Sequence, residues 1–84
     1  MKNIKLEKDI VNFKNQLEDA MSKGKGKFKD MMLSDYRKIM EVLDLYDKGM
    51  TKQAVNKYSN LDTEVYEKFP KSFIRFIDKY EENN

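Results

Sequence analysis

The spacing of apolar side chains is the feature that most constrains how this chain can fold. Near its start, five apolar residues are separated by intervals of four, three, four and three positions: Leu6, Ile10, Phe13, Leu17 and Ala20. An α-helix completes a turn about every 3.6 residues, so these intervals place all five side chains on one face. The pattern predicts an amphipathic helix over residues 3–22, with Val11 and Met21 widening the buried face. This face can pack against the other helices or against a second copy of the chain, as a homodimer.

The same periodicity returns between residues 34 and 69, where residues that end helices divide it. The first segment has an apolar stripe flanked by two more apolar residues: Tyr36, Ile39, Leu43 and Tyr46, with Met40 and Val42. Ser34 is placed to cap this helix, because a serine oxygen can accept a free N–H group of the first turn. Gly49 stands where a residue with left-handed backbone commonly ends a helix, and Thr51 can cap the next one. We therefore expect a corner at Gly49.

Two shorter helices are predicted after this corner. The second helix of the region has a buried stripe of three residues: Ala54, Val55 and Tyr58. Ser59 and Asn60 are residues that turns favour, and Asp62 after them is a strong cap for a third helix. Val65 and Phe69 are expected to face inward from that third helix.

At these residues the chain resembles a class of DNA-binding domain. The run LYDKGMTKQAV, followed by Tyr58, the pair Val65-Tyr66 and Phe69, is similar to the helix-turn-helix of resolvase-like and homeodomain-like domains. In those domains a Leu-Tyr helix, a glycine, a Ser/Thr-Lys start and a Val-Tyr pair on the reading helix recur in this order. The resemblance covers about a third of the chain, and it implies a trihelical unit whose third helix reads DNA.

This sequence departs from the family pattern in length and in charge. Its second helix or turn is about one residue shorter, and the small residue of the turn is Ser59 or Asn60. The reading segment carries three acidic residues and one basic residue: Asp62, Glu64 and Glu67 against Lys68. Its formal charge of −2 repels phosphate.

A basic segment lies between the first helix and this region. The run SKGKGKFKD, residues 22–30, contains four lysines and has a formal charge of +3. Its two glycines disfavour a helix, so we predict a connection over residues 22–33. Such a loop can be a solvated linker, or it can contact phosphates through its ammonium groups and glycine amides. It lacks the spacing of a nucleotide-binding P-loop.

Apolar residues after the basic run are expected to return the chain to the core: Phe28, Met31, Met32 and Leu33. Pro70 then ends the third helix or starts the last segment, residues 70–82. This segment reads as a helix with a broad apolar arc formed by Phe73, Ile77 and Tyr80, with Ile74 and Phe76 beside them. The arc is either embedded in the core or partly kept for a partner.

Together these patterns predict an all-α fold, a small bundle of four to five short helices. The bundle contains a helix-turn-helix-like trihelical unit over residues 34–69, and residues 1–84 form one domain.

Composition narrows the function. The chain has no histidine and no cysteine, so the commonest general base, the usual zinc ligands and thiol chemistry are all missing. We expect no enzyme activity, no catalytic residue, no cofactor and no metal. The charged start and the lack of a long apolar run predict neither a signal peptide nor a membrane helix, hence a cytoplasmic protein. The net charge of +2 selects no partner.

Two hypotheses for function follow. The first is a DNA-binding regulator or accessory protein whose nucleic-acid contacts come from the basic loop and the second and third helices of the trihelical unit: Lys23, Lys25, Lys27, Lys29, Lys52, Gln53, Lys57, Thr63 and Lys68. The second is a protein-binding inhibitor or adaptor, for example one made by a phage or plasmid against a host nucleic-acid enzyme. Its acidic face would dock on a basic partner surface through Asp62, Glu64 and Glu67.

Overall fold

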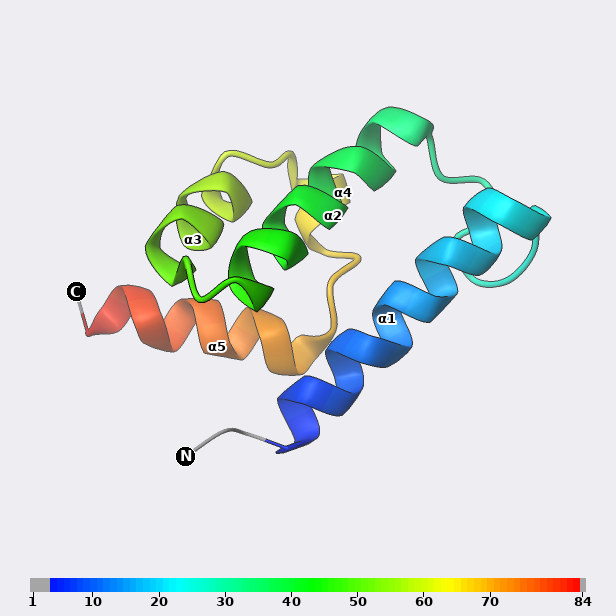
Figure 1. The fold of residues 1–84 in the computed structure, drawn as a ribbon. Helices are drawn as coiled ribbons and strands as arrows, with labels where there is room; N and C mark the ends of the chain where they lie inside the picture. The colour runs from blue at the N-terminus through cyan, green and yellow to red at the C-terminus, as the bar shows by residue number, and fades with distance from the viewer. Residues whose placement is uncertain (1–3, 84) are drawn as a thin grey trace.

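The computed structural model describes residues 4–83, and within them the chain forms five α-helices and no β-strand. The helices are α1 (Ile4–Lys23), α2 (Leu33–Asp47), α3 (Thr51–Ser59), α4 (Thr63–Tyr66) and α5 (Lys71–Glu82). The strongest packing joins α2 to α3, while α1 packs on α5 and α2, and α4 packs on α2 (Figure 1). The predicted all-α bundle of four to five helices is therefore confirmed.

Helix α1 buries the face that its spacing predicts. Leu6, Ile10, Phe13, Leu17 and Ala20 are all buried, as expected. The predicted start at residue 3 lies outside the described residues. Met21 packs at the edge of the core, but Val11 is 56% exposed, so its predicted contribution to the buried face is wrong. Val11 follows Ile10 by one position, which turns its side chain about 100° away from the buried stripe.

Both predicted serine and threonine caps are wrong. Helix α2 begins one residue before Ser34, and α3 begins at Thr51 itself, so both residues lie inside their helices. The N-cap residues are Met32 and Met50, whose side chains make no capping hydrogen bond. Their backbone carbonyls accept the N–H groups of the third and fourth residues of α2, Asp35 and Tyr36, and of the fourth residue of α3, Ala54. Asp62 does occupy the N-cap of α4, although without a side-chain hydrogen bond.

The corner at Gly49 forms as the sequence predicts. Gly49 has a φ of 79°, in the left-handed region that favours glycine. Its N–H donates to the carbonyl of Tyr46, and the N–H of Met50 donates to that of Leu45. These two bonds make a Schellman motif, which satisfies carbonyls at the end of α2 and turns the chain into α3. The second corner, at residues 60–62, separates α3 from α4.

The core is rich in aromatic rings, and Phe73 lies at its centre. Phe73 is fully buried, with ring centroids 5.2 Å from Phe69, 5.6 Å from Tyr46 and 6.0 Å from Tyr58. Ile77 is also fully buried, and the rest of the α5 arc packs against the core. Phe73 and Ile77 are thus embedded in the core, while Ile74, Phe76 and Tyr80 are half-buried at its edge.

The return of the chain after the basic loop is only partly as predicted. Phe28 is buried 5.5 Å from the ring of Phe13, and Met31 is half-buried against the core. Met32 is 68% exposed and Leu33 is 52% exposed, so their predicted core positions are wrong. The turn over residues 27–30 already brings Phe28 inward, which leaves the start of α2 at the surface.

Two tyrosine hydroxyls are held where ionisation is unfavourable. Burial raises the pKa of Tyr58 to about 12, and the negative charge of Asp78 adds to this effect. Burial also raises the pKa of Tyr46 to about 12, with the charge of Glu7 as the next cause. The Tyr46 hydroxyl donates a hydrogen bond to Glu7 Oε1 over 3.2 Å. The folded state therefore binds both phenolic protons more tightly than the unfolded chain does.

We expect the protein to lose stability in alkaline solution. The contribution of Tyr46 and Tyr58 is fully present below their ordinary pKa of 10.0 and is lost as the pH rises through about 12. Urea unfolding followed by circular dichroism between pH 8 and pH 12 measures this loss. The double variant Tyr46→Phe/Tyr58→Phe controls for lysine deprotonation and should show a shallower decline above pH 10. An equally steep decline in that variant would contradict the assignment.

Candidate nucleic-acid and protein interfaces

The basic loop is exposed, but two of its lysines already have partners. Lys23, Lys25, Lys27 and Lys29 are all exposed, and the loop contains two glycines with left-handed backbone, Gly24 and Gly26. The ammonium of Lys23 lies 3.7 Å from a carboxylate oxygen of Asp19. That of Lys27 lies 5.4 Å from the centroid of the Phe28 ring, which the chain buries. Both contacts are at the surface, where they are weak enough for phosphate to replace them.

Helix α3 presents a polar face to solvent. Lys52, Gln53 and Lys57 are exposed, while the predicted stripe of Ala54, Val55 and Tyr58 is buried. Lys57 Nζ lies 3.0 Å from Glu41 Oε1 on α2. This pair partly neutralises Lys57, so Lys52 is the stronger candidate for a phosphate contact.

Helix α4 is a single turn of four residues, shorter than the third helix that the sequence predicts up to Phe69. It ends at Tyr66, and the N–H groups of Lys68 and Phe69 bond to carbonyls three residues earlier, which tightens the chain. Phe69 is buried in this tight turn, and Pro70 after it disfavours helical backbone at Phe69. Thr63 is exposed, while Lys68 is half-buried and donates to the backbone carbonyl of Glu64 over 3.0 Å. Thr63 thus lies at the start of α4, and Lys68 lies in the turn that follows this helix.

The predicted acidic face is exposed and lies beside the basic loop. Asp62, Glu64 and Glu67 are all exposed. Glu64 and Glu67 line a hollow of about 540 Å³ together with Lys27 and Phe28 of the loop. The surface of this hollow is mixed in charge, because it carries the carboxylates of Glu64 and Glu67 and the ammonium group of Lys27.

The predicted nucleic-acid residues do not form one continuous surface. Figure 1 shows the loop after α1 at one end of the molecule and α3 at the other, with α2 between them. The greatest extent of the molecule is 39 Å. The structure thus joins the loop to the acidic α4 segment and separates both from Lys52, Gln53 and Lys57.

A third charged surface is not among those that the sequence predicted. Three exposed cations on α5 share a hollow of about 710 Å³ with one from α1: Lys71, Arg75 and Lys79, with Lys5. We call this hollow the α1–α5 groove. The signal was present in the sequence as basic residues at positions i, i+4 and i+8, a spacing that places them on one helix face.

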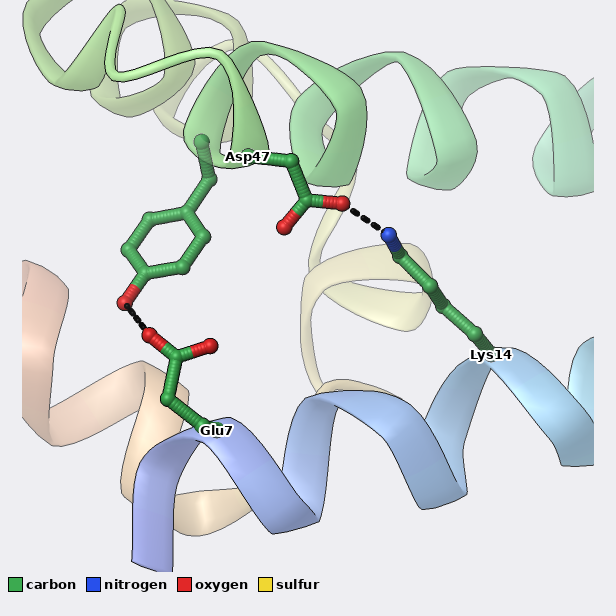
Figure 2. Close-up of polar contacts among 4 residues, drawn as sticks. Glu7, Lys14 and Asp47 are labelled. Atoms are coloured by element: carbon green, nitrogen blue, oxygen red, sulfur yellow. Dashed lines mark hydrogen bonds and ion pairs between the residues drawn. The ribbon is translucent and has the colours of Figure 1, made fainter. Parts of the chain in front are cut away.

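Polar contacts hold the walls of this groove together. The hydroxyl of Ser72 donates to Asp9 Oδ2 over 2.7 Å, which ties α5 to α1. Figure 2 shows the Tyr46 hydroxyl meeting Glu7, and the Lys14 ammonium paired with Asp47, so that the end of α2 is also tied to α1. The two carboxylates of the groove, on Glu7 and Asp9, are therefore both engaged in hydrogen bonds.

Two general features of the described residues, 4–83, complete the description. No helix among them is both long enough and apolar enough to cross a membrane. No group of three acidic side chains among them is arranged so that it could hold a metal ion. Comparison with known protein families, with curated proteins and with solved structures found no match.

Proposed function

We propose that this chain is a non-enzymatic DNA-binding regulator or accessory protein that contacts duplex DNA through α3 and the basic loop. The observation that carries the proposal is the trihelical unit, in which α2, α3 and α4 follow one another through bends at Gly49 and at residues 60–62. This order of helices is the one that a helix-turn-helix unit requires.

The short α4 alters how such a unit would meet DNA. A four-residue helix rises only about 6 Å, and Glu64 and Glu67 repel phosphate. The contacts are therefore expected from Lys52, Gln53 and Lys57 on α3, and from the lysines of the loop. Because most of these contacts would join lysine ammonium groups to phosphates, which carry no sequence information, binding of this kind depends little on sequence.

Duplex binding at different salt concentrations tests the proposal. The affinity for a labelled 20-base-pair duplex, measured by fluorescence anisotropy, should fall steeply with salt. In the double variant Lys52→Gln/Lys57→Gln, the slope of log affinity against log salt should become shallower by about 1.8, since each phosphate contact contributes about 0.9. The matched control is Lys8→Gln/Lys38→Gln, which removes the same charge from exposed positions on α1 and α2. No duplex binding at low salt, or equal slopes in both variants, would remove the proposal.

The second candidate is a protein-binding inhibitor or adaptor, and the exposure of Asp62, Glu64 and Glu67 together on one turn favours it. Reversing two of these charges, Glu64→Lys/Glu67→Lys, separates the candidates. A DNA-binding protein should then bind duplex more tightly. A protein-binding module should instead lose its partner in a pull-down from host cells, whether or not the extract has been treated with nuclease.

A further inference from the structure

We propose that the α1–α5 groove binds single-stranded nucleic acid, at a site separate from the duplex contacts proposed for α3. The groove combines a row of cations with an aromatic wall, which are the two features that sequence-tolerant binding of single strands uses. The inference does not depend on the helix-turn-helix resemblance, because no residue of α3 or α4 lines this groove.

The cations form a row rather than a cluster. Lys71, Arg75 and Lys79 follow one another at intervals of four residues along α5, so each is about 6 Å further along the helix axis than the last. Among the described residues, no ion pair engages these three side chains or Lys5. A row of ammonium and guanidinium groups matches a chain of phosphates better than it matches a single carboxylate.

The acidic residues nearby do not cancel this row. Glu7 and Asp9 line the groove, but each accepts a hydrogen bond, from Tyr46 and Ser72 respectively. Four cations against these two carboxylates leave the groove with a formal charge of +2. Glu81 of α5 lies in a different hollow, with Lys52 of α3.

The apolar side of the groove is aromatic and well fixed. Phe76 and Tyr46 line it with their ring centroids 5.4 Å apart, and both rings are half-buried. The ring of Phe76 also packs 6.1 Å from that of Phe73, which is fully buried. The exposed part of Phe76 is therefore held in place, and a base can stack on it without first ordering the side chain. Duplex DNA cannot use this wall, since its base faces are covered by their neighbours.

Anisotropy with a labelled twelve-nucleotide oligo(dT), at 50 mM salt, tests this site. The exposed triple variant Lys71→Gln/Arg75→Gln/Lys79→Gln should bind oligo(dT) at least tenfold more weakly than the wild type. A matched control, Lys8→Gln/Arg37→Gln/Lys38→Gln, removes two lysines and one arginine from exposed positions on α1 and α2 outside the groove and should lose less than threefold. Comparing oligo(rU) with oligo(dU), which differ only in the ribose hydroxyl, shows whether that hydroxyl affects affinity, and binding of either strand supports the site.

The aromatic wall is tested by Phe76→Leu, which keeps apolar volume but removes the ring. This variant should bind oligo(dT) at least fivefold more weakly, given the usual contribution of stacking on one ring. Thermal melts followed by circular dichroism check that every variant is folded. If Phe76→Leu is unfolded, the triple variant alone decides, because its three side chains are exposed.

Three results would overturn the site. They are no binding of oligo(dT) by the wild type, an equal loss in the triple variant and its matched control, or competition by poly-glutamate as strong as that by unlabelled oligo(dT). The last result would make the groove a site for acidic peptides. Duplex binding measured on the same triple variant keeps the two proposals apart, because the α3 contacts do not use these residues.

Discussion

The variant Phe73→Ala should lose about 3–5 kcal/mol of its free energy of unfolding. Phe73 is fully buried and its ring contacts those of Tyr46, Tyr58, Phe69 and Phe76, so truncation leaves a cavity that four neighbouring rings cannot easily fill. A domain has only about 5–15 kcal/mol in total, so this loss is a large fraction of the stability and should lower the urea midpoint strongly. Urea unfolding followed by circular dichroism measures the loss.

The control for Phe73→Ala is Val11→Ala, which truncates a side chain that is 56% exposed. Its effect should stay within about 0.5 kcal/mol, as for most surface substitutions. If both variants lost the same free energy, the aromatic cluster would not be the main source of stability.

The second large effect is expected at Gly49. A side chain at this left-handed position costs about 1–2 kcal/mol, and a β-branched one costs more. A Cβ built on Gly49 has no neighbouring atom within 4 Å, so the cost comes from the backbone and not from crowding. The free energy of unfolding should therefore fall in the order Gly49→Asn, Gly49→Ala, Gly49→Val, from least to most destabilising.

The series at Gly49 contains its own control, because asparagine tolerates left-handed backbone better than alanine or valine does. Urea midpoints of the three variants, compared with the wild type, test the order. A Gly49→Val variant as stable as the wild type would mean that the corner does not require a positive φ.

Much of this fold was predictable because apolar spacing is a strong signal in helices. The buried faces of α1 and α3 match the sequence, as do Ile39 and Leu43 of α2. The caps were not predictable, since a side-chain cap contributes only about 1 kcal/mol, and α2 and α3 begin directly after Met32 and Met50, whose side chains make no capping hydrogen bond. The apolar side chains of Met32 and Leu33 also led to a wrong prediction of burial, because helix α2 starts at the surface.

The candidate surfaces were harder to predict than the core. The formal charge of α5 is zero, since Lys71, Arg75 and Lys79 balance its three acidic residues, and a sum over the sequence therefore hides the row of cations. Recognising the groove also requires knowing that α1 lies beside α5 and brings Lys5 to it. Likewise, nothing in the local pattern indicates that Lys27 and Glu64 line the same hollow. These are products of tertiary packing.

Tyr46 connects the α1–α5 groove to the corner at Gly49. Its hydroxyl meets Glu7 in the α1–α5 groove, and its backbone carbonyl accepts the N–H of Gly49 at the corner that leads into α3. A ligand that changes the Tyr46–Glu7 hydrogen bond would therefore act on a residue that also holds the corner. If binding in the groove changed the affinity of α3 for duplex DNA in this way, duplex binding would change the affinity of the groove for its ligand by the same factor.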